Sequence, residues 1–209
     1  MLAKAPHLSQ SSDPFKMSLP TVKLSEGIHV MHLFYRVDRM VWDEMDPTDS
    51  QSTREKLQKL CAANAESSHP LIRTYANIGG KCDLAIWLFH EELGGLGQMH
   101  RDLEACFPAG ALEMVYSYFS VTELTEYMPT DDDLKARALR EFKLEEGTPE
   151  FDEKMVELCQ WKDDYEQFRL YPEMPDWEVM CFYPMLKKRT GEDNWYMLDF
   201  DTRKALMKT

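Results

Sequence analysis

A nine-residue stretch, CFYPMLKKR at residues 181–189, places an aromatic hydroxyl close in sequence to a cluster of cations. In an extended strand alternate side chains share a face, so Tyr183 and Lys187 would project together. At about 3.3 Å per residue they would stand roughly 13 Å apart. A phenol and an ammonium at this spacing suit a large planar ligand better than a phosphate. Pro184 has no N–H for a ladder, which predicts a sheet edge or a bulge.

Two further stretches carry side chains of the same kind. FRLYP, predicted to be extended, places Arg169 and Tyr171 on one face, and a guanidinium can bind a carboxylate through two hydrogen bonds. In MVYSYFSV, Tyr116 and Tyr118 likewise share one face of a predicted strand. Together these groups suit a flat, apolar molecule with several carboxylates. The competing interpretation is ordinary, because tyrosines are common on sheets and basic side chains beside strands are usually solvated.

Composition excludes several classes of function. Hydrophobic residues make up 44% of the 209 residues, which is typical of a globular protein. The formal net charge of −13 argues against nucleic acid or an anionic membrane as the main partner. Five cysteines, an odd number without CxxC spacing, indicate reduced thiols. The sequence has no signal-peptide core and no run of transmembrane length, so we expect a cytoplasmic protein.

The elements that must position these side chains begin with a regular first half over residues 26–128. Hydrophobic periodicity and turn residues predict strands, helices and a turn. The strands are expected at 28–39, 69–79, 81–90 and 113–124, and the helices at 49–67 and 91–107. A turn at Gly79 and Gly80 would join the middle two strands. The order β-α-β-β-α-β is the ferredoxin-like arrangement, an α+β fold.

The rest of the chain divides into three segments. Residues 1–25 are predicted to be a flexible N-terminal arm, and residues 129–168 an acidic helical connector with Thr148 as a helix N-cap before Pro149. Residues 169–209 begin a second half. Its predicted elements are a strand at 176–186, a short extended piece at 194–198 and a helix from 199 that Asp199 caps. With one strand and one helix, this half is expected to be incomplete.

The run RLYPEMPDWEVMCFYPMLKKRTGEDNWYML, residues 169–198, closely resembles the chlorite dismutase-like family. It is most similar to the coproheme decarboxylase branch, the peroxide-dependent haem synthases, in its RLYP, YPM and NWYML motifs. The stretch YSYFSVTEL, residues 116–124, is a weaker echo of the same branch. The resemblance is specific over residues 169–208, weaker over 28–128, and absent from the N-terminal arm and most of the connector.

The resemblance implies a fold, a cofactor and a reaction. The fold is two ferredoxin-like halves forming a dimeric α+β barrel, with haem in the C-terminal half and the chains assembled as a ring homo-oligomer, a pentamer in the family. The reaction is the oxidative removal of two propionate groups from iron coproporphyrin by hydrogen peroxide, in haem biosynthesis. Iron coproporphyrin is then both substrate and cofactor.

The resemblance also implies roles for the matched residues. Tyr183 corresponds to the radical-forming tyrosine, which takes a hydrogen from a propionate side chain. Lys187 corresponds to the lysine that holds the second reactive propionate. The implied cofactor-binding positions are Arg169, Tyr171, Trp195 and, on weaker similarity, Tyr116 and Tyr118.

The chain departs from the family pattern at the iron ligand. In this branch RxxLM is followed, two residues later, by a His-Gly pair whose histidine binds the iron, whereas RKALMKT ends at Thr209, one residue before that position. None of the six histidines is an obvious substitute. His29 and His32, for example, lie three apart on a predicted strand and so face opposite sides, and we assign no metal ligand.

Three interpretations therefore stay open. The first is a decarboxylase represented by a truncated chain. The second is an inactive or structural haem-binding relative without an axial ligand. The third is a chlorite dismutase-like haem peroxidase, against which Tyr183 and Lys187 count because they have no evident use in splitting chlorite.

Overall fold

The computed structural model of the chain describes residues 22–66, 71–175 and 177–207. Most of the predicted N-terminal arm lies outside these residues. The chain divides into two compact units, Met1–Val121 and Thr122–Thr209, and each is described by itself. The expected division into four segments stays a prediction, and the connector and the beginning of the second half fall within one unit.

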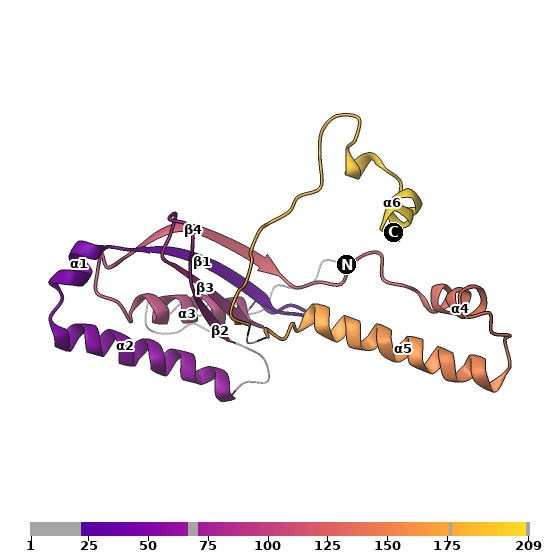
Figure 1. The fold of residues 1–209 in the computed structure, drawn as a ribbon, viewed down its shortest axis with the longest axis horizontal. Helices are drawn as coiled ribbons and strands as arrows, with labels where there is room; N and C mark the ends of the chain where they lie inside the picture. The colour runs from indigo at the N-terminus through magenta and orange to yellow at the C-terminus, as the bar shows by residue number, and fades with distance from the viewer. Residues whose placement is uncertain (1–21, 67–70, 176, 208–209) are drawn as a thin grey trace, which may run out of the picture. The chain divides into compact units, whose positions relative to one another are not determined.

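The first unit contains a four-stranded antiparallel sheet with the strand order β2-β3-β1-β4 (Figure 1). Its elements are β1 (His29–Val37), α1 (Arg39–Glu44), α2 (Pro47–Ala62), the 3₁₀ helix η1 (Ala63–Glu66), β2 (Ile72–Ala76), β3 (Leu84–His90), α3 (Leu93–Glu104) and β4 (Leu112–Val121). The order of strands and helices, with β1 and β3 at the centre, is the ferredoxin-like topology. The fold class expected from the sequence is confirmed.

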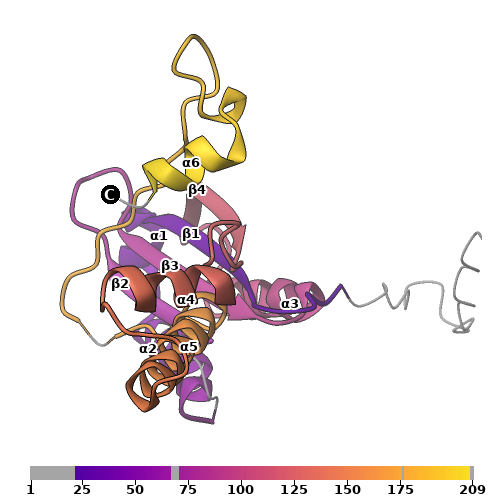
Figure 2. The same ribbon diagram turned by 90° about the vertical axis from the view of Figure 1, so that its right-hand side faces the viewer.

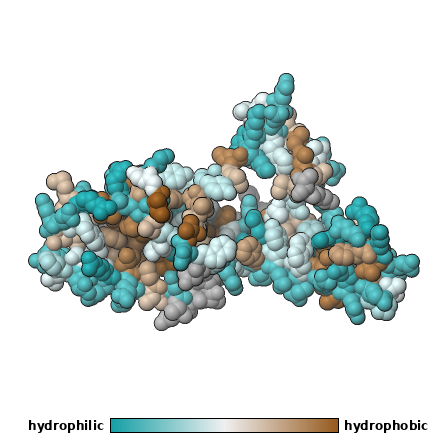
Figure 3. Space-filling view, in the orientation of Figure 1, coloured by the Kyte–Doolittle hydropathy of each residue, from teal (hydrophilic) through white to brown (hydrophobic). Residues whose placement is uncertain are grey.

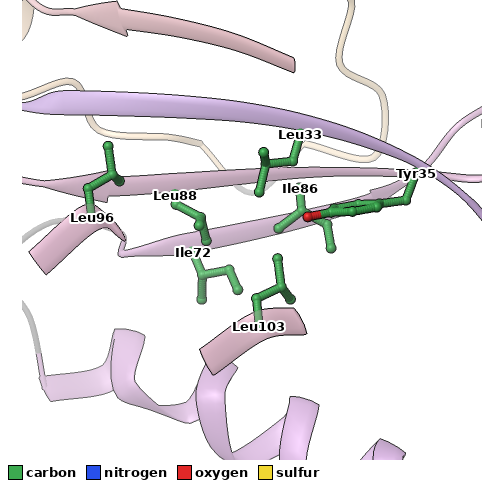
Figure 4. Close-up of a cluster of buried hydrophobic side chains, with 7 residues drawn as sticks. All are labelled: Leu33, Tyr35, Ile72, Ile86, Leu88, Leu96 and Leu103. Atoms are coloured by element: carbon green, nitrogen blue, oxygen red, sulfur yellow. The ribbon is translucent and has the colours of Figure 1, made fainter. Parts of the chain in front are cut away.

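Alternating side chains of the sheet build the core of this unit. Leu33 of β1 and Ile86 and Leu88 of β3 are almost completely buried, and they point toward Leu96 and Leu103 of α3 (Figure 4). Burial of side chains of this size contributes about 1.5–3 kcal/mol each. The period-2 pattern of the strands and the 3.6-residue pattern of α3 therefore meet in a single apolar layer.

The connection between β2 and β3 contains the two glycines that the sequence marked as a turn. Gly79 and Gly80 have φ angles of 145° and 78°, a region that side chains with a Cβ rarely adopt. The turn is closed by Asn77, whose N–H donates to the Asp83 carbonyl at 2.8 Å and whose side-chain amide donates to the Cys82 carbonyl at 3.1 Å. The register then pairs Ile72 with Leu88. The predicted hairpin is confirmed.

The second unit is built from helices and irregular chain (Figures 1 and 2). Its elements are α4 (Asp131–Arg140), α5 (Pro149–Leu170), the 3₁₀ helix η2 (Trp195–Met197) and α6 (Phe200–Leu206). A small cluster of Leu134, Ala138, Phe151 and Leu158 packs α4 against α5. None of the helices in the described part of the chain is both long and apolar enough to cross a membrane.

Three helix N-termini in this unit are capped by side chains that the sequence supplies. Thr130 and Asp133 form a reciprocal capping box at α4. The Thr148 hydroxyl accepts the Phe151 N–H at α5, with Pro149 in the first turn. The Asp199 carboxylate accepts the Thr202 N–H at 2.9 Å at α6. The caps predicted at Thr148 and Asp199 are confirmed.

Three predictions for the second half are wrong. Residues 177–186, expected to be a strand, have no regular secondary structure, because no strand in the described ranges pairs with them. Residues 194–198, expected to be extended, contain the 3₁₀ helix η2, which Asn194 caps by accepting the Tyr196 N–H. FRLYP, also expected to be extended, is mostly the last turn of α5, since the helical hydrogen bonds of α5 continue to Leu170.

Candidate functional site

The CFYPMLKKR segment is almost entirely exposed to solvent. Tyr183 is 68% exposed, Met185 80% and Leu186 78%. Because the segment is not a strand, the expected alternation that placed Tyr183 and Lys187 on one face of a sheet does not apply. Pro184 accordingly marks neither a sheet edge nor a bulge. The segment presents its phenol and cations to solvent, where a ligand can reach them.

A short loop follows, and local hydrogen bonds close it. The Trp195 N–H donates to the Lys188 carbonyl at 3.0 Å, and the Asn194 side-chain amide donates to the Arg189 carbonyl at 2.6 Å. The Lys188 ammonium also forms an ion pair with Asp193 at 2.9 Å. Between them Gly191 has a φ angle of 77°, which lets the chain reverse. The loop thereby returns η2 to the cationic end of CFYPMLKKR.

This return places two cations over aromatic rings. The Lys187 ammonium lies 4.5 Å from the centroid of the Trp195 ring, and the Arg189 guanidinium lies 4.9 Å from the centroid of Tyr196. Cation–π contacts at exposed sites contribute about 0.5–1 kcal/mol. The structure therefore brings together two residues that the sequence proposed separately, Lys187 and Trp195. Such a group of cations on flat apolar faces can bind a planar molecule that carries carboxylates.

Arg169 and Tyr171 lie at the end of α5. Arg169 is exposed in the last helical turn, and Tyr171 is the half-buried C-cap residue, whose N–H donates to the Gln167 carbonyl at 2.8 Å. A cation is favourable at a helix C-terminus because it complements the helix dipole. Both residues belong to the same unit as Lys187, but they do not share the face of a strand. Their expected roles in binding carboxylates stay predictions.

Tyr116 and Tyr118 belong to the first unit and lie on β4. They share the sheet face that carries Phe34 and His32, with ring centroids 5.6 and 5.9 Å from these neighbours. The prediction that the two tyrosines share a face is confirmed. They are 49% and 36% exposed, and apolar side chains reach the surface over this sheet in Figure 3.

Two ion pairs that the sequence analysis missed connect α6 to the beginning of the second unit. The Arg203 guanidinium donates to Glu126 at 2.8 Å, and the Lys204 ammonium donates to Asp133 at 2.7 Å. The hydrogen bond from Lys204, followed by that from the Thr130 N–H, lowers the pKa of Asp133 to about 2. The capping-box spacing of Thr130 and Asp133 was visible in the sequence, but the partner on α6 was not.

An aromatic contact accompanies these ion pairs. The Tyr127 ring stacks on Phe200 with centroids 5.7 Å apart and an interplanar angle of 22°. Burial raises the pKa of the Tyr127 phenol, and Glu126 raises it further. We call the whole set the α6 clamp: Glu126, Tyr127, Asp133, Phe200, Arg203 and Lys204.

The histidines that the structure describes all belong to the first unit and have structural partners. The His29 ring lies 3.0 Å from the Glu91 carbonyl, and His32 lies 3.1 Å from the Ser120 hydroxyl. Burial lowers the pKa of His32 to about 4, so it is neutral at physiological pH. Over residues 22–66, 71–175 and 177–207, no group of three or more His, Cys, Asp or Glu side chains is placed to hold a metal ion.

Comparison with known proteins gives a consistent relationship. The sequence profile of the family described as chlorite dismutase matches residues 50–209. A haem-binding protein from Thermus thermophilus is 30% identical with a TM-score of 0.65, over 90% of this chain and 66% of that protein. A mutant chlorite dismutase from Candidatus Nitrospira defluvii is 14% identical with a TM-score of 0.50, over 88% of this chain and 63% of that protein. The chain thus spans slightly less than two thirds of each of these two proteins.

Proposed function

The chain belongs to the chlorite dismutase family, and we propose that it binds iron coproporphyrin and serves the peroxide-dependent oxidative removal of two of its propionate groups. Family membership supports haem-dependent oxidoreductase chemistry in general. The choice of iron coproporphyrin, and the role in haem biosynthesis, rest on the residues of one segment.

One observation carries the proposal. The Lys187 ammonium lies 4.5 Å from the Trp195 ring centroid, in the segment that also contains Tyr183. A porphyrin needs a flat apolar surface, and its propionates need cations. Lys187 and Trp195 supply both within one contact, and Arg189 over Tyr196 supplies a second pair of the same kind. A neutral ligand would have no use for these cations.

The residues present fit the carboxylate side of such a ligand. Lys187 would hold one propionate by an ion pair, and the Trp195 indole would offer an apolar face to the porphyrin. Arg169 and Tyr171, at the end of α5, would bind further propionates. When bound, the porphyrin iron supplies the oxidising chemistry with hydrogen peroxide. Tyr183 would give up the hydrogen atom of its phenol and then take one from a propionate side chain at the same oxygen.

Each decarboxylation is a two-electron oxidation. A propionate loses CO₂ and becomes a vinyl group, and the two electrons reduce one molecule of hydrogen peroxide to two of water. The proton balance needs one further proton per propionate. Two propionates therefore consume two molecules of peroxide, and no other oxidant is required.

The proposal is tested by titrating the chain with iron coproporphyrin and then adding hydrogen peroxide. Absorbance spectra report binding, and mass spectrometry is expected to show two successive losses of CO₂ with two hydrogens each. Protohaem, which lacks the two reactive propionates, is the matched control ligand and should gain no new products of this kind. Binding of iron coproporphyrin without any decarboxylated product contradicts the proposed reaction.

A second candidate is haem binding without decarboxylation. It is supported by the Thermus thermophilus relative, which is described as a haem-binding protein. The same titration distinguishes the two functions, because this candidate predicts a bound porphyrin that keeps all its carboxylates.

A further inference from the structure

The α6 clamp is more buried than the other contacts around the candidate site. The side chains of Arg203 and Lys204 are 19% and 20% exposed, and those of their partners Glu126 and Asp133 are 51% and 30% exposed. In contrast, the ion pair of Lys188 with Asp193 is 56% and 85% exposed. A partly buried ion pair is screened less by salt than an exposed pair. The clamp is therefore the firmest electrostatic attachment of α6 that the described chain contains.

The clamp is connected to Lys187 through consecutive contacts. Tyr127 stacks on Phe200, the first residue of α6, and only Leu198 and Asp199 separate α6 from η2, which begins at Trp195. The Lys187 ammonium in turn lies over the Trp195 ring in a cation–π contact. A contiguous path thus leads from the chain before α4 to the cation that we assign to the propionate.

This path matters because the chain before η2 has little structure of its own. Residues 177–189 form no helix or strand, and most of their side chains are exposed. Their local hydrogen bonds close the loop that ends at Trp195. The contacts of α6 with residues 126–133 hold the chain that directly follows this loop.

We propose that Glu126, Tyr127 and Asp133 are positioning residues, which hold α6 and η2 so that Trp195 presents Lys187 to the carboxylate of a bound porphyrin. This role rests on the proposed function, since it concerns the same site. None of the three residues needs to touch the porphyrin. They act through Phe200, Arg203 and Lys204, whose sequence separation from them reaches 77 residues.

The ion pair of Glu126 with Arg203 allows a charge-exchange test in the full chain. Glu126→Arg and Arg203→Glu each place like charges opposite one another, whereas the double variant restores an ion pair of reversed polarity. Glu146→Arg is the matched control, because it makes the same charge change in the same unit and breaks an ion pair with Lys135 outside the clamp. Glu126 is suited to this test because it is not a helix cap.

Amide hydrogen exchange gives the first readout. In both single variants we expect the amides of η2 and α6 to exchange about tenfold faster than in the unaltered chain, with recovery in the double variant. The amides of β1 should not change in any variant, and Glu146→Arg should leave α6 unchanged. Unchanged exchange in the single variants, or no recovery in the double variant, would contradict the claim that the ion pair of Glu126 with Arg203 holds η2 and α6.

Titration with iron coproporphyrin, followed by its absorbance spectrum, gives the second readout. The single variants should bind about tenfold more weakly, and the double variant should approach the unaltered chain. Faster exchange of α6 with unaltered porphyrin affinity overturns the positioning role. If the unaltered chain binds no iron coproporphyrin, the proposed function fails, while the exchange data still decide whether the clamp orders η2 and α6.

Tyr127 supports a separate comparison of two variants. Tyr127→Phe keeps the stacking on Phe200 and removes only the phenol hydroxyl, whereas Tyr127→Leu removes the stacking. We expect porphyrin affinity to stay close to that of the unaltered chain in Tyr127→Phe and to fall in Tyr127→Leu. Equal affinity of all three overturns the contribution of Tyr127.

Discussion

Two nine-residue stretches of this protein contain the same kinds of side chain but lie in opposite environments. β1, HVMHLFYRV, and residues 181–189, CFYPMLKKR, both combine apolar, aromatic and basic side chains. In β1, Leu33 and Tyr35 are at most 1% exposed, and strands pair with both edges. In the second stretch Tyr183 is 68% exposed, and no described strand pairs with it. A strand-like sequence becomes a strand only where neighbours accept its hydrogen bonds.

The same contrast applies to the forces that hold each region. β1 is held by ladder hydrogen bonds and by an apolar layer shared with β3 and α3. Residues 187–207 are held by cation–π contacts, by ion pairs and by one aromatic stack. Buried apolar packing is worth more per residue than exposed ion pairs. The region around the candidate site should therefore open locally at a lower free-energy cost. A single substitution in the sheet should cause the larger loss of stability.

The largest effect is expected from a cavity in the sheet. Leu88→Ala removes a side chain with no exposed surface and should lower the free energy of unfolding of the first unit by about 2–5 kcal/mol. Leu186→Ala, at a position of the second unit that is 78% exposed, should change the free energy of unfolding by no more than about 0.5 kcal/mol. Denaturant unfolding followed by circular dichroism measures both. Equal losses of unfolding free energy in the two variants would contradict the expected difference between the buried and the exposed stretch.

Mild acid should affect the sheet first. Burial lowers the pKa of His32 from 6.5 to about 4. Between these pH values the unfolded chain therefore binds a proton at His32 that the folded chain does not bind. Stability of the first unit should therefore fall by about 3 kcal/mol as the pH decreases from 6.5 to 4. Unfolding measured across this pH range checks the slope. His32→Gln, which keeps an amide for Ser120, should flatten it; an unchanged slope would exclude His32 as the cause.

The exposed stretch should show the opposite behaviour, a large effect on activity with little effect on stability. Tyr183→Phe removes only the phenol hydroxyl and should lower peroxide-dependent decarboxylation at least about a hundredfold. Iron coproporphyrin binding and the free energy of unfolding should stay close to those of the unaltered chain. Tyr165→Phe is the matched control, since it removes a phenol from α5 of the same unit, at a residue outside the candidate site. Decarboxylation that survives in Tyr183→Phe would remove this residue from its proposed role.

The smallest effect is expected from strong acid acting on the clamp. The hydrogen bond from Lys204, then that from the Thr130 N–H, lowers the pKa of Asp133 from 3.8 to about 2. Its contribution, about 1 kcal/mol, should be present above pH 3.8 and disappear as the pH falls toward 2. NMR signals of α6 followed from pH 5 to 2 measure this change. In Asp133→Asn the transition should be absent, and its persistence would assign it to another carboxylate.

The sequence by itself determined the sheet of the first unit, but not the short helix α1. Burial left an apolar pattern in β1 and β3, and residues that favour extended chain marked the exposed β4. The caps at Thr148 and Asp199 were predicted for a similar reason, since capping is a contact over three residues. The resemblance over residues 169–198 identified the family, which the profile over residues 50–209 confirms.

Only the tertiary structure decided the arrangement of the second unit. The stretch around Tyr183 reads as a strand, but strand pairing depends on hydrogen bonds to distant segments, and these leave no signal in the stretch itself. The clamp between Asp133 and Lys204, which are 71 residues apart, has the same character. The extension of α5 through Arg169 and the return of Trp195 onto Lys187 are local, but the expectation of extended chain hid them. Local patterns predict which residues are buried or capped, whereas contacts between charged residues far apart in sequence are set by the path of the folded chain.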